Sequence, residues 1–114
     1  MKKDPVIFLK HIKENIERIE QQVENINKEL FFKNIDIQDA TARRVEIIGE
    51  AVKNLPLSFR KKYPQIPWKA IAGFRDKLIH HYFGIDLGKM WKVVKDDLPF
   101  LKKEINNIID DLEK

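Results

Sequence analysis

The apolar residues of the first thirty positions follow a heptad repeat. They recur at alternating steps of three and four residues, with glutamate and lysine at most positions between them: Leu9, Ile12, Ile16, Ile19, Val23, Ile26 and Leu30. This period places a single apolar stripe along one helix. Asp4 can cap that helix and Pro5 suits its first turn, so we predict a long helix from Pro5 to about Leu30. A stripe this regular requires a helical partner along its length, from the same chain or from a second copy.

Four more helices are predicted from apolar spacing and from residues that favour helix starts. Asp36 can cap the second helix, and Pro67 can open a third that continues to about Tyr82. Asp86 can cap a fourth, and the fifth begins at Asp97-Leu98-Pro99. No segment alternates in the way a half-buried strand does. The prediction is therefore an all-α fold, an antiparallel bundle of four to five helices.

Length and composition limit the chain further. Its 114 residues fit a single domain over positions 1–114. No cysteine is present, which excludes disulfides, thiolate zinc sites and cysteine nucleophiles. The basic N-terminus leads into a charge-rich helix rather than an apolar secretory segment, and no apolar run approaches the roughly 20 residues that cross a bilayer. We therefore expect a cytoplasmic protein.

The positive charge is concentrated in the middle of the chain. The net formal charge is −1 for residues 1–42, +7 for residues 43–92 and −2 for residues 93–114. A positive centre favours the binding of a polyanion or of an acidic partner there. A lysine-rich, solvated surface is the alternative that charge alone leaves open.

Arg75 is the residue that conflicts most with the predicted third helix. On a helical projection it lies near the middle of an apolar arc about 100° wide. A guanidinium in that position is costly unless it is paired or lines a cleft. Pairing with a buried carboxylate, Glu46 or Glu50 of the second helix, is one interpretation. The other is that Arg75 binds a phosphate, for which its planar fork is suited.

His80 is a second candidate on the same helix. Asp76 precedes it by four residues and could orient the imidazole, while the nearby helix C-terminus would favour the protonated ring. Arg75 and His80, however, would lie about 140° apart around a straight helix. Either the helix loosens before Gly84, or the two groups approach a ligand from flanking positions, or a second copy of the chain completes the site. A surface histidine without catalytic function is the simpler interpretation.

These two residue types suit the cleavage of RNA by its own 2′-hydroxyl. A histidine that titrates near neutrality can move the protons, and an arginine can stabilise the negative charge that develops on the phosphate. The sequence has no His-x-x-x-His, no zinc-ligand spacing, no clustered acidic set for two magnesium ions and no Gly-rich phosphate loop. We therefore expect neither a metal site nor a cofactor.

The segment from Arg75 to Tyr82 resembles the Arg-x4-His-x-Tyr motif of HEPN-domain proteins of the HepT-like group. The resemblance covers most of the chain from Asp36 to about Leu101. The sequence blocks that carry it, beside the motif itself, are residues 43–51, 63–68, 71–75, 81–84 and 91–99. It implies a HEPN-like helical bundle that forms a homodimer. It also implies a ribonuclease toxin of a type VII toxin–antitoxin system, with RNA as substrate and a minimal nucleotidyltransferase of the MntA type as antitoxin.

The resemblance also implies roles for individual residues. Arg75 and His80 would be the catalytic pair, Asp76 would support His80, and Tyr82 would be the tyrosine that the antitoxin AMPylates. Basic residues that could guide the RNA backbone are Arg43, Arg44, Lys69 and Lys77. The sequence departs from the family pattern at Asp76, where asparagine is frequent, and it has a second histidine, His81, inside the motif.

A non-catalytic binding module is the alternative function. In that interpretation the chain is the dimeric companion of a nucleotidyltransferase. Arg75 would be a structural ion-pair partner, Tyr82 an ordinary core aromatic residue, and the basic centre a surface that docks an acidic protein.

Overall fold

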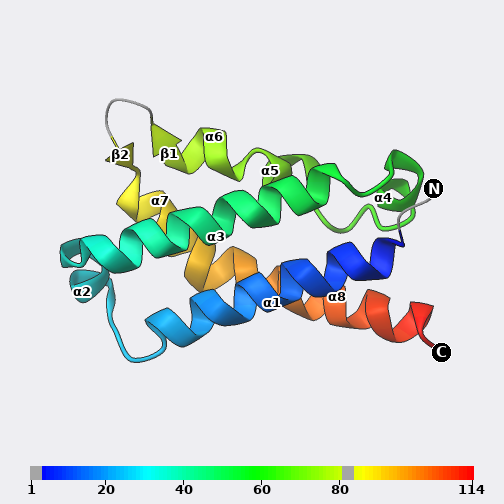
Figure 1. Ribbon diagram of the computed structural model, residues 1–114, viewed down its shortest axis with the longest axis horizontal. Helices are drawn as coiled ribbons and strands as arrows, with labels where there is room; N and C mark the ends of the chain where they lie inside the picture. The colour runs from blue at the N-terminus through cyan, green and yellow to red at the C-terminus, as the bar shows by residue number, and fades with distance from the viewer. Residues whose placement is uncertain (1–3, 81–83) are drawn as a thin grey trace.

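The computed structural model describes residues 4–80 and 84–114, and of His80 only the backbone. Helices account for most of these residues, and three long helices form the main body of the fold (Figure 1). In chain order the elements are α1 (Pro5–Val23), α2 (Lys28–Lys33), α3 (Ile35–Lys53), α4 (Leu57–Lys61), α5 (Trp68–Ala72), α6 (Phe74–Leu78), β1 (Ile79–His80), β2 (Gly84–Ile85), α7 (Leu87–Lys92), the π-helical turn η1 (Val93–Asp97) and α8 (Leu98–Leu112). The predicted all-α class is confirmed, with a two-stranded hairpin as the exception.

Helix α1 lies between α3 and α8 and runs antiparallel to both (Figure 1). Its heptad stripe is fully buried at Leu9, Ile12, Ile16 and Ile19. The helical partners that the repeat requires are therefore found in the same chain. Burial of these side chains against α3 and α8 is the largest contribution that α1 makes to folding.

The predicted end of the first helix is wrong by seven residues. Helix α1 ends at Val23, and the amide of Leu30 donates to the side chain of Asn27 at 2.8 Å, so a separate short helix begins there. An asparagine that satisfies a free amide in this way favours a new helix start over continuation. As a result Phe31 is buried in the core, whereas Leu30 is exposed.

The second predicted helix is confirmed, with a start that differs slightly from the prediction. Asn34 caps α3 by accepting from the amide of Ile37 at 3.0 Å, so Asp36 lies in the first turn instead. Gly49 marks the contact with α5, because a Cβ at this position would lie 3.2 Å from the carbonyl oxygen of Ala72. This close approach fixes the distance between α3 and the segment that carries Arg75.

The third predicted helix is the main error in the expected fold. In place of one helix from Pro67 to about Tyr82, the structure has one turn of α5, a break at Gly73, one turn of α6 and then extended backbone from Ile79. Ile79 pairs with Ile85 and His80 with Gly84 in an antiparallel hairpin. β-Branched residues favour such pairing, and Gly84 has a φ of +77°, which glycine adopts without strain.

The predicted starts of the last two helices are confirmed. Asp86 caps α7 by accepting from the amide of Lys89, and α8 begins at Leu98. The turn η1 joins α7 directly to α8, so the two predicted helices form one continuous helical segment with no loop between them. Among the described residues, none of the helices has both the length and the apolar character needed to cross a membrane.

Candidate active site

The motif lies where helix changes to strand. Arg75 is on α6, the backbone of His80 is in β1, and Tyr82 lies outside the described residues. The amide of Asp86 donates to the carbonyl of Leu78 at 2.8 Å, which fastens the base of the hairpin to the end of α6. The backbone between Arg75 and His80 is thus held by the hairpin and by the α6 turn.

Arg75 faces a cavity rather than the core. Its side chain is 47% exposed. The break at Gly73 separates α6 from the buried side of α5, so the apolar arc of the helical projection does not extend to Arg75. The expectation that its guanidinium lies in apolar surroundings is therefore wrong, and the expectation that it lines a cleft is confirmed.

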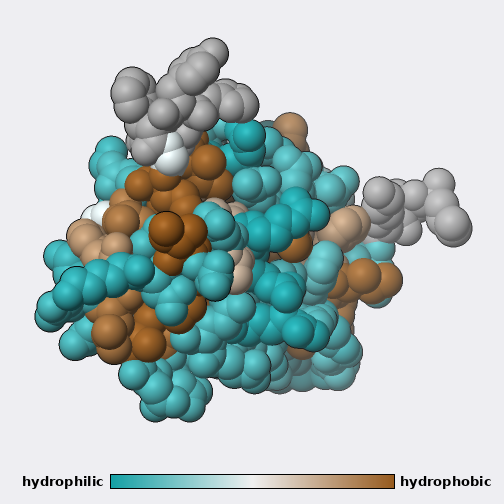
Figure 2. Space-filling view, turned by 60° about the vertical axis from the view of Figure 1, so that its left-hand side comes forward, coloured by the Kyte–Doolittle hydropathy of each residue, from teal (hydrophilic) through white to brown (hydrophobic). Residues whose placement is uncertain are grey.

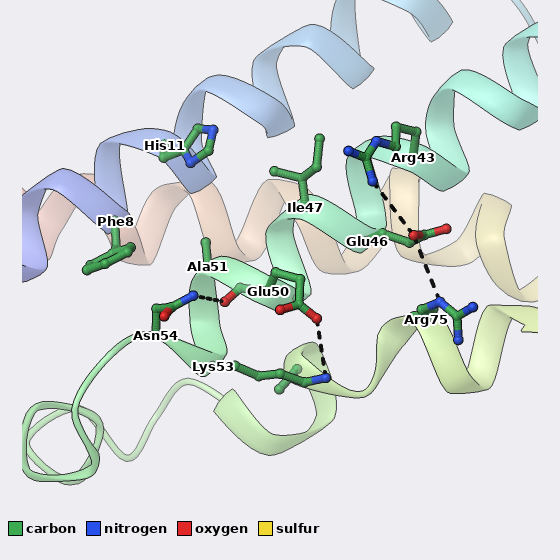
Figure 3. A pocket seen from close by; sticks show the side chains of 12 residues that line it. Phe8, His11, Arg43, Glu46, Ile47, Glu50, Ala51, Lys53, Asn54 and Arg75 are labelled. Carbon is green, nitrogen blue, oxygen red and sulfur yellow. Dashed lines mark hydrogen bonds and ion pairs between the residues drawn. The ribbon is translucent and has the colours of Figure 1, made fainter.

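The cavity has a volume of about 470 Å³ and lies between α1, α3 and the α5–α6 segment (Figure 3). Its size is that of a small-molecule binding site. Charged and apolar residues contribute to it together: Phe8, His11, Arg43, Glu46, Ile47, Gly49, Glu50, Ala51, Lys53, Asn54, Ala72 and Arg75.

Glu46 is the carboxylate nearest to Arg75. Figure 3 shows two guanidinium groups approaching it from opposite sides, and Oε2 of Glu46 lies 3.9 Å from Nε of Arg75 and 3.9 Å from Nη1 of Arg43. Both separations exceed hydrogen-bond distance. The predicted carboxylate partner is therefore found at Glu46 and not at Glu50, and it leaves the hydrogen-bond donors of Arg75 available. The other carboxylate near Arg75 is Asp76, whose Oδ1 lies 3.8 Å from Nη1.

The expected pairing of Asp76 with His80 rests on helical spacing, and the side chain of His80 lies outside the described residues. Four residues separate the two, but α6 ends at Leu78 and His80 continues in extended backbone. The one-turn spacing of a helix therefore does not apply between them. The expectation that a helix C-terminus favours the protonated imidazole also loses its basis, because α6 has only five residues and ends before His80.

The four basic residues expected to guide RNA are not gathered at one place. Arg43 lines the cavity with Arg75, whereas Arg44 donates to Oδ1 of the buried Asn15 at 2.9 Å and so holds α3 against α1. Lys69 and Lys77 line a separate hollow on the other side of α5 and α6, together with Asp76.

Sequence reasoning missed two basic side chains of the cavity, His11 of α1 and Lys53 of α3. A signal for Lys53 was present, because Arg43, Glu46, Glu50 and Lys53 recur at steps of three and four and so share one face of α3. His11 gave no comparable signal, since its approach to α3 depends on how the two helices pack.

Fold and site together define a class: small helical proteins in which the arginine of an Arg-x4-His-x-Tyr motif lines a cavity with further basic side chains. The profile of the family described as "Ribonuclease HepT-like" matches residues 12–108. The chain belongs to this family.

Three relatives illustrate the similarity. A "Gamma-glutamylcyclotransferase and putative RNase" of Methanocaldococcus jannaschii is 54% identical over 114 residues, which are 100% of this chain and 51% of that protein. A "Putative RNase" of the same organism is 48% identical over 98% of this chain and 93% of its own. A "Probable ribonuclease HepT" of Thermococcus cleftensis is 44% identical over 95% of this chain and 98% of its own. The chain thus spans about half of the first relative and nearly all of the other two. No solved structure shows a significant match to the chain.

Proposed function

We propose that the chain is a metal-independent endoribonuclease and the toxin of a type VII toxin–antitoxin pair. The observation that carries the proposal is the state of Arg75. Its guanidinium is half-exposed, it faces a cavity, and its two carboxylate neighbours lie at 3.8 and 3.9 Å. The guanidinium can therefore donate two parallel hydrogen bonds to a phosphate, which it does not do to either carboxylate. The names of the relatives, which include a "Probable ribonuclease HepT", support RNA as the substrate.

The proposed reaction needs proton transfer and charge stabilisation. The 2′-oxygen of a ribose attacks the adjacent phosphorus, the bond from phosphorus to the 5′-oxygen breaks, and a 2′,3′-cyclic phosphate and a 5′-hydroxyl result. His80 would take the proton of the 2′-hydroxyl and return one to the 5′-oxygen, because an imidazole titrates near neutrality. Arg75 would hold the non-bridging oxygens as their negative charge increases.

The proposed regulation is AMPylation of Tyr82 by a minimal nucleotidyltransferase of the MntA type. Transfer of AMP from ATP to the phenolic oxygen releases pyrophosphate and leaves a negatively charged phosphodiester two residues after His80. That charge would repel the RNA backbone from Arg75 and His80. Intact mass after co-expression with the partner tests this step, since the adenylyl increment should disappear in Tyr82→Phe.

The proposed assembly is a homodimer. Figure 2 shows an apolar patch at the end of the molecule where Figure 1 places α2, the start of α3 and α7. Leu30, Phe32 and Ile35 are exposed at this end, and Ile35 has 68% of its surface accessible. Exposed apolar residues that lie together favour a protein interface. A change from dimer to monomer in Ile35→Glu, measured by light scattering after size exclusion, would support this location.

The alternative of a non-catalytic companion of a nucleotidyltransferase has one observation in its favour. It expects Arg75 to be an ion-pair partner, and Glu46 does lie beside it. The pair is long, with side chains that are 47% and 31% exposed, and ion pairs near the surface contribute only about 0–1 kcal/mol to stability. A contribution of this size is too small to explain Arg75 as a structural residue alone.

RNA cleavage by purified protein separates the two functions. With a chelator present, wild type should cut RNA, and both Arg75→Ala and His80→Ala should lose the activity. Arg18→Ala is the matched control, because Arg18 is 53% exposed and its partner Glu14 lies on the same helix, α1. Unchanged cleavage in both site variants would exclude the proposed site. An inactive, unmodified wild type would favour the companion.

A further inference from the structure

The cavity continues along α3 beyond the position of Arg75. The four charged residues of the shared α3 face run along it in the order Arg43, Glu46, Glu50 and Lys53, with a cation at each end (Figure 3). Ten residues of helix correspond to a rise of about 15 Å. The cavity is therefore elongated, with Arg75 near one end and His11 of α1 at the other, and we call it the α1–α3 groove.

The cations of the α1–α3 groove are weakly engaged. Arg43 is 71% exposed and Lys53 is 56% exposed, and the nearest carboxylate oxygens lie at 3.9 Å and 3.6 Å. Lys102 on α8, by contrast, donates a 2.9 Å hydrogen bond to Glu20. A phosphate can replace such long, exposed contacts at little cost in free energy.

The two carboxylates restrict where a polyanion can lie in the groove. Glu46 and Glu50 occupy the middle, so a phosphate is disfavoured there and favoured near Arg43, Arg75 and Lys53. Between the ends, the carboxylates can accept hydrogen bonds from the amino groups of bases, as acidic side chains do with cytosine.

The remaining lining is suited to bases. Ile47, Ala51 and Ala72 provide apolar walls, and His11 lines the groove from α1 (Figure 3). Histidine is among the side chains on which unpaired RNA bases stack. A cavity of about 470 Å³ has room for a nucleobase.

We propose that the α1–α3 groove binds the single-stranded RNA that adjoins the phosphate held by Arg75. Lys53 and Arg43 contact flanking phosphates, and His11 stacks on a base. This inference rests on the proposed nuclease function for its choice of ligand. It adds a binding segment that begins at Arg75 and ends on α1, and so it assigns functions to His11 and Lys53 that the motif does not contain.

The test measures binding without cleavage. Fluorescence anisotropy with a labelled, single-stranded 2′-O-methyl oligonucleotide gives a Kd, because this RNA lacks the attacking hydroxyl. Lys53→Ala and His11→Ala should each raise the Kd about three- to tenfold, and Lys53→Ala should reduce the slope of log K against log salt by about 0.7. Lys10→Ala is the matched control. Lys10 is 56% exposed, as Lys53 is, but its Nζ pairs with Glu113 at the end of α8, outside the groove.

Each outcome decides between the two proposals. If Lys53→Ala and His11→Ala bind as Lys10→Ala does while Arg75→Ala abolishes cleavage, the groove is not the RNA path and the nuclease function stands. If both variants weaken binding but wild type cuts no RNA, the groove stands and the nuclease function fails. Displacement of the oligonucleotide by polyglutamate at equal charge concentration would overturn the inference in favour of an acidic protein ligand. Circular dichroism of every variant confirms that it is folded.

Discussion

Replacing Glu46 with glutamine tests whether Arg75 is oriented by its neighbour. Glutamine keeps the shape and one acceptor oxygen but removes the charge that lies 3.9 Å from both Arg75 and Arg43. Two exposed pairs of this length contribute about 0–1 kcal/mol each, so Glu46→Gln should lower the free energy of unfolding by no more than about 1–2 kcal/mol. The variant should therefore remain folded at the assay temperature.

The same limit sets the expected effect on cleavage. If Glu46 acts only by orienting the guanidinium of Arg75, the transition-state stabilisation lost in Glu46→Gln cannot exceed the free energy of the Glu46–Arg75 ion pair. A free energy of about 1 kcal/mol corresponds to about a fivefold change in rate. We therefore expect kcat to fall two- to fivefold. The Kd for 2′-O-methyl RNA should fall at the same time, because one negative charge is removed beside the phosphate.

The assay compares Glu46→Gln with Glu50→Gln, one helical turn further along α3. Glu50 is paired with Lys53 at 3.6 Å and has no ion pair with Arg75. Its replacement should strengthen RNA binding and leave kcat unchanged. A hundredfold fall of kcat in Glu46→Gln would refute the reasoning, because the carboxylate would then act in the chemistry itself.

Three further changes test the fold around the site. Ile16→Ala removes a fully buried side chain from the contact of α1 with its neighbours, and it should lower the free energy of unfolding by about 2–5 kcal/mol in urea titrations. Gly84→Ala forces a φ of +77° on alanine at the position paired with His80, and it should lower the free energy of unfolding by about 1–2 kcal/mol. At a temperature where both variants are folded, it should lower kcat more than Ile16→Ala does. Glu20→Gln should lower the thermal midpoint at pH 7 by a few degrees, because the hydrogen bond from Lys102 to Glu20 raises the pKa of that lysine. Since a raised lysine pKa stabilises the fold only while the amine is protonated, this difference from wild type should persist up to about pH 10 and vanish as the pH rises through the pKa of Lys102, as calorimetry across pH would show.

Those parts of the fold that depend on one helix face were predictable from the sequence. The stripe of α1 through Val23, the cap of α7 at Asp86 and the start of α8 at Leu98 follow from spacing and capping within a few residues. The end of α1 was not predictable in the same way, because the apolar repeat continues past Val23 to Leu30. The cap at Asn27 favours a new helix start, and the burial of Phe31 in place of Leu30, which depends on the packing of α2, stabilises it.

The site was less predictable than the fold, because its contacts join segments far apart in the sequence. Arg75 was identified from its position in the motif, but its exposure depends on the break at Gly73. That break lies beside the close contact of Ala72 with Gly49. This contact joins two helices, so the residue pattern of a single helix does not reveal it. The same holds for His11, which lies in the groove only because α1 packs on α3.

The change from helix to strand alters the spacing expected between Arg75 and His80 in the motif. On a continuous helix Arg75 and His80 would lie about 140° apart, and one side of the helix could not present both to the same phosphate. The structure instead ends α6 at Leu78 and pairs His80 with Gly84, which corresponds to the loosening of the helix considered from the sequence. The hairpin, and not the helical repeat, then determines the position of His80. The amide of Ile79 donates to the carbonyl of Arg75, and Ile79 has a φ of −119°. Ile79→Pro removes this donor and fixes φ at about −65°, so it should abolish cleavage while the α1–α3–α8 core remains folded.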